Sequence, residues 1–450
     1  MPDLHRPHTT QSTHLTRLPF FYGWVILGCV CAAGFARQGP AVATLSVFIE
    51  PMTDELGWSR TAISGAVSLG GILAAILSPM LGPLLDRHGA RVMLVAAVLA
   101  SGLSVMAISQ VETLLLFYVC FVVGRMCFAG PFDLGIYGAI NSWFVMRRPM
   151  ATAIATTAQM IGLTAMPLIA TAATTWSGDD WRMGWIAVGT TVLVVGLLPN
   201  LLLMVRSPED VGLQPDGRNL GAPSTEADTK RLTASVEEPD FTRAEALRRP
   251  AFWLLSLFTL LVFPVQAGVS LHQAPHLIES GIDPTIAATV VSTFSVLSAI
   301  SGLLFGAVAR RLSVRVLLVI VGLSLGASAL MMIGVTTALW AYAAAAVFGV
   351  GIGGLLTMLP IAWADFFGRR SFGAIRGIAL TVQVVAQAAG PILSGYLRDL
   401  TGDYTMSLAT LGALGLASAG IAIFARPPER PNRAELPKFA PQSKDSSDEN

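Results

Sequence analysis

Charged residues are scarce in this sequence. Only 13% of its 450 residues are Asp, Glu, Lys or Arg, whereas 53% are hydrophobic. Soluble globular domains carry about a quarter charged residues, so the composition excludes an ordinary soluble protein and indicates a membrane protein. The formal net charge is only +1, which gives no electrostatic reason to expect a nucleic-acid partner.

Cysteine and recognisable catalytic clusters are also scarce. The four cysteines, Cys29, Cys31, Cys120 and Cys127, all lie within apolar runs. Their spacing matches neither a zinc site nor a disulfide framework. The sequence shows no nucleophile–base set, metal-ligand cluster or nucleotide-binding glycine loop. We therefore expect no enzyme activity, no cofactor and no metal ion.

Long apolar runs dominate instead. Runs of bilayer-spanning length begin near residues 20, 59, 92, 113, 150, 183, 251, 285, 316, 339, 375 and 405. They predict an all-α integral membrane protein with twelve transmembrane helices. The first run is too long for a signal-peptide core and lacks a cleavage site after it, so it is counted as helix 1.

The basic residues predict how these helices are oriented. With a cytoplasmic N-terminus, 24 of the 29 Lys and Arg fall in cytoplasmic segments, 3 lie outside and 2 lie within helices. When the basic residues of the central linker and the C-terminal tail are left out, 12 Lys and Arg remain in cytoplasmic segments against 3 outside. The positive-inside rule therefore places both termini in the cytoplasm, and we expect a multi-pass protein of the inner membrane.

A cluster of charge recurs at a fixed distance along the chain. Residues 82–91 read Gly-x-Leu-x-Asp-Arg-x-Gly-x-Arg, and residues 306–315, 224 positions later, read Gly-x-Val-x-Arg-Arg-x-Ser-x-Arg. The same offset relates Gln159 to Gln383. One offset from helix 2 to helix 6 predicts two homologous six-helix halves.

The two halves define the expected domains. These are a cytoplasmic tail at 1–19, an N-terminal bundle at 20–205, a cytoplasmic linker at 206–249, a C-terminal bundle at 250–425 and a cytoplasmic tail at 426–450. The linker is rich in Pro, Gly, Ser, Thr and charge, which is typical of a flexible connection. Near its end, the capping-box pattern from Thr242 to Glu245 predicts a short helix.

The repeated halves and the charged cluster between helices 2 and 3 resemble the major facilitator superfamily. The positions that carry the resemblance are Gly82, Leu84, Asp86, Arg87, Gly89 and Arg91. The resemblance implies the major facilitator fold and alternating access by two rocking halves. It also implies that this cluster latches the halves together on the cytoplasmic side, although the charges could simply anchor a tight loop.

The residue types suit such a latch. Gly82 and Gly89 allow close backbone approach, and we place Asp86 at the start of helix 3, where the helix dipole favours a carboxylate. Arg87 and Arg91 can pair with Asp86 or with neighbouring helix ends. In the second half an arginine replaces the acid, so a latch there is weaker or differently built.

Several strings resemble one branch of the superfamily, the bacterial relatives of monocarboxylate transporters and oxalate/formate antiporters. They are FYGWVIL at 21–27, GWSR at 57–60, WF followed by RRP at 143–149, RSPEDVGLQPDG at 206–217, DFFGRRSFGAIRG at 365–377 and GPILSGYLRDLTGDY at 390–404. They identify a lineage, and a lineage does not fix the substrate.

Ionisable residues at membrane depth are costly and are functional candidates by default. Arg37 lies in GFARQGP, where Gly39 and Pro40 suggest a break in helix 1, and Arg125 lies in helix 4. The resemblance implies a cavity lined mainly by helices 1, 4, 7 and 10. Two arginines facing that cavity favour an anionic substrate. Alternatively, Arg125 binds backbone carbonyls and Arg37 snorkels outward.

Three further residues are candidates. Asp133 either carries a coupling proton or pairs with loop arginines near the cytoplasmic mouth, and it is poorly placed to pair with Arg125. His272, near the outer end of helix 7, binds substrate or a proton, or has a structural role at the interface. Gln383 adds a hydrogen bond to substrate, although such amides equally hold helices together.

The chain departs from the branch in the second half. Carboxylate transporters of this lineage often carry an arginine in helix 8, and oxalate-type members a lysine in helix 11; here Gly302 and Gln383 occupy those positions. The resemblance therefore implies a monocarboxylate or another small organic anion, moved by a monomeric, proton-coupled secondary transporter. The alternatives are proton-antiport efflux of drugs or metabolites, and a transporter-like membrane sensor.

Overall fold

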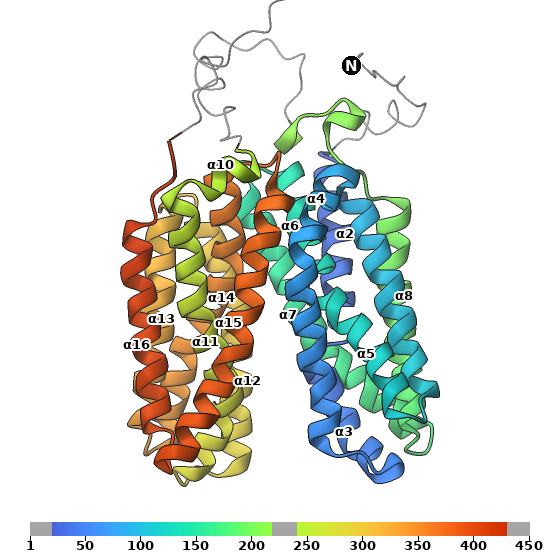
Figure 1. Cartoon of the computed structure of the whole chain (residues 1–450), viewed down its shortest axis with the longest axis vertical. Coiled ribbons are helices and arrows are strands. Elements are labelled where there is room, and N and C mark those ends of the chain that lie inside the picture. The colour runs from blue at the N-terminus through green and yellow to red at the C-terminus, as the bar shows by residue number, and fades with distance from the viewer. Residues whose placement is uncertain (1–19, 218–240, 430–450) are drawn as a thin grey trace, which may run out of the picture.

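The computed structural model describes residues 20–217 and 241–429, which are almost entirely helical (Figure 1). The long helices are α2 (Gly23–Ala36), α3 (Val42–Leu56), α4 (Arg60–Ala107), α5 (Leu114–Ala129), α6 (Pro131–Trp143), α7 (Arg148–Trp176), α8 (Trp181–Leu202), α11 (Pro250–Glu279), α12 (Pro284–Val308), α13 (Val314–Ile333), α14 (Ala338–Phe367), α15 (Phe372–Thr401) and α16 (Thr405–Phe424). The expected tail at 1–19 lies outside the described residues, as do residues 430–450 of the expected tail at 426–450 and residues 218–240 of the expected linker.

The described chain makes the twelve predicted crossings. Ten helical spans are long and apolar enough to cross a membrane. One of them contains α4, whose 48 residues measure about 72 Å, roughly twice a hydrocarbon core. Gly89, with φ 80°, divides α4 into two crossings. The pair α2 and α3 forms a further, broken crossing, and α5 and α6 form a broken fourth crossing.

The helices form two bundles, α2–α8 and α11–α16, which stand side by side in Figure 1. The internal repeat is visible in the backbone. Gly178 and Gly402, 224 positions apart, follow α7 and α15 with φ values of 79° and 85°. Gly57 and Gly281, with the same offset, have φ values of 69° and 83°. The prediction of two homologous six-helix bundles is therefore confirmed.

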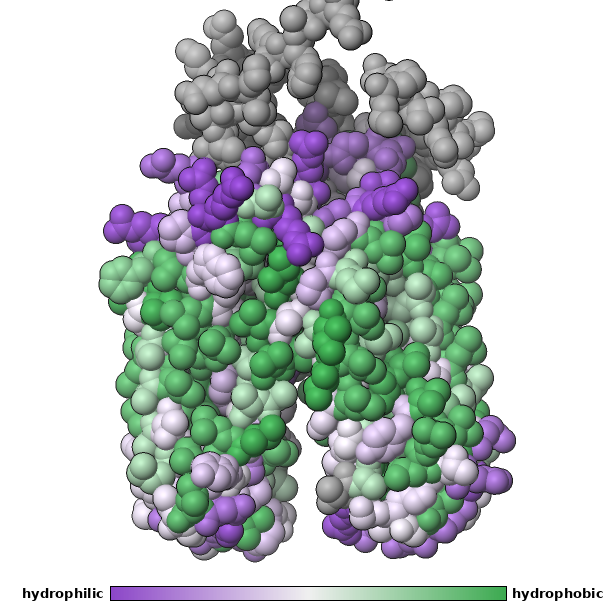
Figure 2. All heavy atoms as spheres, in the orientation of Figure 1, coloured by the Kyte–Doolittle hydropathy of each residue, from purple (hydrophilic) through white to green (hydrophobic). Residues whose placement is uncertain are grey.

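The bundles meet at one end and separate at the other, as the space-filling view shows (Figure 2). We call the end that carries residues 206–217 and 241–247 the closed side, and the opposite end the open side. The short helix α10 (Arg243–Leu247) lies on the closed side, and the predicted capping box is confirmed at its start.

Glycines permit the close approach of the bundles. A Cβ on Gly82 of α4 would lie 2.1 Å from the carbonyl oxygen of Gly373 at the start of α15. Its repeat equivalent, Gly306 of α12, would place a Cβ 2.8 Å from the carbonyl oxygen of Pro149 at the start of α7. The same contact therefore occurs twice, related by the repeat.

Candidate functional site

A break in the first crossing positions Arg37. The helix α2 ends at Ala36, and α3 begins at Val42. Arg37 is the C-cap of α2, and Pro40 cannot continue the helical hydrogen bonds. A cation at a helix C-terminus is favoured by the helix dipole, so the predicted break gives the buried arginine a favourable place.

A second break positions Asp133. Gly130, with φ −111° and ψ −87°, separates α5 from α6, and Pro131 is the first residue of α6. Asp133 lies in the first turn of α6, where the helix dipole favours a carboxylate. Broken helices that point their ends at a central site are typical of transporters.

Side chains from both bundles form one buried network. The Nη1 of Arg37 donates a hydrogen bond to Oε1 of Gln159 at 2.8 Å and lies 3.6 Å from Oδ1 of Asp133. The Nη2 of Arg376, on α15, donates to Oδ2 of Asp133 at 3.1 Å and to Oε1 of Gln383 at 2.8 Å. All five side chains are buried. Asp133 therefore links the N-terminal bundle to the C-terminal one.

This network borders a cavity of about 210 Å³ between the bundles. Its polar lining is Arg37, Gln38, Asp133, Tyr137, Thr156, Gln159, Gln266, Arg376, Gln383 and Gln387, and its apolar lining is Phe128, Met160, Leu163, Phe263, Leu355, Leu356, Leu359 and Pro360. Among these residues there are two arginines and one carboxylate, so the lining carries a formal charge of +1.

The structure brings three of the predicted site residues together. Arg37, Asp133 and Gln383 line the cavity. Asp133 pairs with Arg37, in the break of the first crossing, and with Arg376 of α15, whereas one alternative placed it beside loop arginines. Gln387, also in the cavity lining, donates a hydrogen bond to Gln266 of α11, which shows an amide holding two helices together.

Arg125 is not among the cavity-lining residues. Its guanidinium lies over the ring of Phe128, 4.3 Å from the centroid, and the guanidinium of Arg37 lies 4.5 Å from the same centroid. Within the described residues, Arg125 makes no hydrogen bond or ion pair, and its Nε is buried. The Phe128 ring therefore contacts both guanidinium groups, and of the two arginines it is Arg37 that also pairs with a carboxylate, that of Asp133.

His272 also lies away from the cavity lining. One ring nitrogen, Nδ1, is 3.1 Å from the hydroxyl of Tyr404, and Nε2 is 3.2 Å from the carbonyl oxygen of Pro391. These contacts tie α11 to α15 and α16. The geometry matches the structural alternative for His272, and we do not assign substrate binding to it.

Sequence reasoning missed Arg376. This residue lies in the string DFFGRRSFGAIRG, and the charge count treated it as cytoplasmic. The helix α15 begins at Phe372, three residues before the predicted start, and Arg376 is 1% exposed. One signal could have found it: Arg376 precedes Gln383 by seven residues, which places both side chains on the same helix face.

The charged cluster on the closed side joins the two bundles. The carboxylate of Asp86 accepts hydrogen bonds from the backbone N–H groups of Gly373 at 2.7 Å and Ala374 at 2.8 Å. The placement of Asp86 at the start of helix 3 was wrong, because α4 is helical up to Gly89. Asp86 instead caps α15, in the other bundle, where the positive end of the helix dipole favours it.

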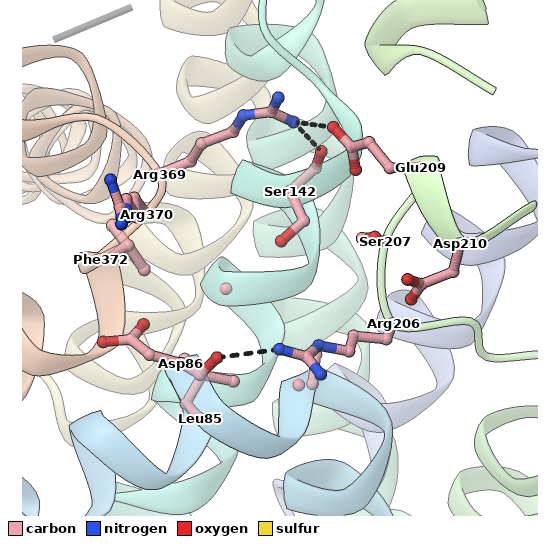
Figure 3. A pocket seen from close by; sticks show the side chains of 13 residues that line it. Leu85, Asp86, Ser142, Arg206, Ser207, Glu209, Asp210, Arg369, Arg370 and Phe372 are labelled. Atoms are coloured by element: carbon pink, nitrogen blue, oxygen red, sulfur yellow. Dashed lines mark hydrogen bonds and ion pairs between the residues drawn. The ribbon is translucent and has the colours of Figure 1, made fainter. Parts of the chain in front are cut away.

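The arginines of the cluster differ in their surroundings. Arg91 donates from Nη2 to the carbonyl oxygen of Leu201 at 2.6 Å, so it pairs with a neighbouring helix end, as one alternative predicted. Arg87 is exposed. Arg206, just after α8, donates to the backbone carbonyl of Asp86 at 3.2 Å (Figure 3).

Further ion pairs beside this cluster join the C-terminal bundle to the N-terminal bundle and to the segment after α8. Arg369, between α14 and α15, lies 2.8 Å from Glu209 and donates to the carbonyl oxygen of Ser142 at 3.3 Å (Figure 3). Arg148 and Asp365 form an ion pair at 2.6 Å. These contacts all lie on the closed side, where ion pairs and charge-assisted hydrogen bonds therefore hold the two halves together.

The segment after α8 also ties down the start of α7. The carboxylate of Asp216 accepts hydrogen bonds from the backbone N–H groups of Val145, Met146 and Arg147 at 3.2, 2.7 and 3.2 Å. By the repeat, the start of α7 corresponds to the start of α15, which Asp86 caps. The repeat equivalent of Asp86 in the second half is Arg310, which has no carboxylate. At the start of α7, Asp216 supplies the carboxylate instead.

Two bundles around a charged cavity, fastened at one end, define a membrane transporter. The model of the Major Facilitator Superfamily matches residues 26–391 and 273–446. The chain belongs to this superfamily, whose members are transporters and not enzymes.

Individual relatives are distant. The chain is 26% identical over 440 residues to human "Monocarboxylate transporter 11", covering 93% of this chain and 87% of the relative. It is 23% identical over 255 residues to the oxalate:formate antiporter of Oxalobacter formigenes, covering 56% and 54%. The structure of the proton:xylose symporter XylE matches with a TM-score of 0.71 and 14% identity, covering 90% of this chain and 96% of that one. The predicted fold and the resemblance to this branch are confirmed.

Proposed function

We propose that the protein is a secondary active transporter of a small organic anion, best described as a monocarboxylate. The observation that carries this proposal is the cavity between the bundles, which is lined by Arg37, Arg376 and a single carboxylate, Asp133. Asp133 neutralises one arginine, and the remaining positive charge suits one carboxylate of a substrate. The positions at which carboxylate transporters of this branch often carry basic residues are Gly302 and Gln383 here. Arg376 supplies a cation from the second half instead.

The size of the cavity favours a small metabolite over a drug. A volume of about 210 Å³ is below the roughly 300–1,000 Å³ that enclose drug-sized ligands. The apolar wall formed by residues such as Leu163, Phe263 and Leu359 suits the uncharged part of an organic acid. The names of the monocarboxylate and oxalate:formate relatives agree with this substrate class.

The proposed cycle is alternating access coupled to protons. The positive-inside rule assigns the closed side to the cytoplasm, so the structure corresponds to an outward-facing state. Substrate enters from the open side, and the bundles then rock until the contacts of Asp86 and Arg369 break. Proton coupling is supported by the buried carboxylate in the cavity and by the fold shared with a proton:xylose symporter.

Liposomes that contain a pH-sensitive dye test this function. Purified protein is reconstituted, and internal pH is recorded while pyruvate, lactate, formate, oxalate or phenylacetate is added outside. We expect saturable, protein-dependent acidification with one or more of the monocarboxylates and none with oxalate. Folded protein that gives no response to any monocarboxylate would refute proton-coupled monocarboxylate transport.

A further inference from the structure

We infer that Asp133 and the substrate carboxylate exchange places between Arg37 and Arg376, and that the displaced Asp133 takes up the coupling proton. This inference rests on the proposed anion transport. It assigns substrate binding and proton binding to a constellation on helices 1, 4 and 11.

Asp133 occupies the position that a substrate carboxylate would take. Its Oδ1 faces Arg37 at 3.6 Å, and its Oδ2 faces Arg376 at 3.1 Å. The carboxylate thus bridges a cation from each bundle at the edge of the cavity. A carboxylate that enters the cavity has the same charge and the same two acceptor oxygens.

The arginines have more donors than Asp133 can satisfy. A guanidinium carries five N–H groups. In the described part of the chain, Nε and Nη1 of Arg376 and Nε of Arg37 are buried without a hydrogen-bond partner. The distance of 3.6 Å between Arg37 and Asp133 is also too long for a hydrogen bond. A second carboxylate therefore gains contacts that the resident one leaves unmade.

Displacement forces Asp133 to become neutral. Asp133 is 3% exposed, and a buried carboxylate without a partner is strongly unfavourable, so it takes up a proton instead. The groups facing it are Arg37 on α2, Tyr137 on its own helix and Arg376 on α15, with Arg125 beyond the Phe128 ring. None of them is a carboxylate, so Asp133 is the acceptor for the proton.

The charges balance over the exchange. Before it, Arg37, Arg376 and Asp133 sum to +1. Afterwards, two arginines, one substrate carboxylate and a protonated Asp133 again sum to +1. One anion and one proton have entered together, which is electroneutral symport. Before the exchange, the ion pair between Asp133 and Arg376 links the two bundles. After it, the substrate carboxylate links them instead, because it lies between Arg37 and Arg376.

Measuring exchange and proton-driven accumulation separately distinguishes substrate binding from proton coupling. Radiolabelled pyruvate and phenylacetate serve as the small and the larger monocarboxylate probes in proteoliposomes. Exchange is measured with equal probe on both sides and no pH gradient, and accumulation is measured with an inward proton gradient. The variants are Asp133→Asn, Asp133→Glu and Arg376→Gln. The control is Asp283→Asn, which makes the same acid-to-amide change at the exposed N-cap of α12, where Asn caps as well as Asp.

Each variant has a distinct expected result. Asp133→Asn imitates the protonated state, so exchange stays within about threefold of the native rate while proton-driven accumulation falls about tenfold or more. Arg376→Gln raises the probe concentration for half-maximal exchange about tenfold or more. Asp133→Glu restores accumulation at least in part, and Asp283→Asn changes neither mode. Size-exclusion profiles and unfolding temperatures confirm that each variant is folded.

Different failures have different meanings. Native protein that moves neither probe refutes the proposed function together with this inference. Native protein that accumulates a probe, with a folded Asp133→Asn variant that accumulates it equally well, refutes only the inference. So does a folded Asp133→Asn variant that loses exchange, because Asp133 would then be needed for binding. Unchanged half-maximal exchange in Arg376→Gln also refutes it.

Discussion

Arg37, which is buried, and Arg125, which is half-buried, are both arginines of the first bundle, yet their surroundings differ. Arg37 lines the cavity and donates a hydrogen bond to Gln159. Arg125 is not part of the lining, and its guanidinium lies over the ring of Phe128. Both are arginines within apolar runs of the sequence, so the sequence could not separate their roles. Only Arg37 reaches the space that a substrate would occupy.

We expect Arg37→Gln and Arg125→Gln to differ in KM. Loss of a charge-assisted contact, worth about 1.5–3 kcal/mol, raises the KM of Arg37→Gln for the transported anion about tenfold or more. Arg125→Gln leaves KM within about twofold, because no contact to substrate is lost. Initial rates of anion uptake measure both. An equal rise in KM for Arg125→Gln would place that arginine in the binding site.

His272 is expected to affect stability and not substrate affinity. His272→Ala removes the contacts to Tyr404 and Pro391, and we expect the free energy of unfolding to fall by about 1–2 kcal/mol. KM should not change. Unfolding in detergent and uptake kinetics measure the two quantities, and His88→Ala, at an exposed position, is the control. A raised KM with unchanged stability would restore the substrate-binding role.

At the scale of the helices, broken and capped ends set the geometry. The break near Pro40 is readable from local sequence, because Gly39 and Pro40 together disfavour a continuous helix. The break at Gly130 was not predicted, although Gly130-Pro131 carries the same signal. The cap on α15 and the contact with the turn before α7 could not be predicted, because Asp86 and Asp216 come from elsewhere in the chain.

The contact of Asp216 with the turn before α7 makes a testable contribution. Asp216→Gly removes the carboxylate but tolerates the φ of 61° at this position, so the expected loss of unfolding free energy, about 1–2 kcal/mol, reports the hydrogen bonds that the carboxylate accepts. Asp216→Asn keeps one acceptor oxygen and loses less. Chemical denaturation measures the change against Asp210→Gly, at an exposed position of the same segment. Equal losses at both sites would show that these hydrogen bonds of Asp216 contribute nothing.

At the scale of the whole molecule, the closed side sets the state of the transporter. Two glycine contacts and several ion pairs hold the bundles together there, while the open side is separated (Figure 2). In the proposed transport cycle, the balance between the outward-facing and inward-facing states therefore depends on how closely α4 and α15 approach.

Gly82→Ala should prevent closure. The added Cβ would lie 2.1 Å from the carbonyl oxygen of Gly373, which is backbone and cannot move aside without separating the bundles. We expect transport to fall about tenfold or more and a cysteine placed at Ser142 to react faster with a maleimide. Gly28→Ala is the control, since nothing lies within 4 Å of its Cβ. Unchanged labelling of the cysteine would contradict this role for Gly82.

The amino-acid sequence by itself determined the twelve crossings, the repeat and the superfamily. These features depend on hydropathy, spacing and local motifs, which are properties of neighbouring residues. The tertiary structure decided which charges meet. Arg376 reaches Asp133 across 243 residues, and Asp86 reaches Gly373 across 287. Such partners depend on how the two bundles pack, since a buried charge pairs with whatever the opposite bundle places beside it.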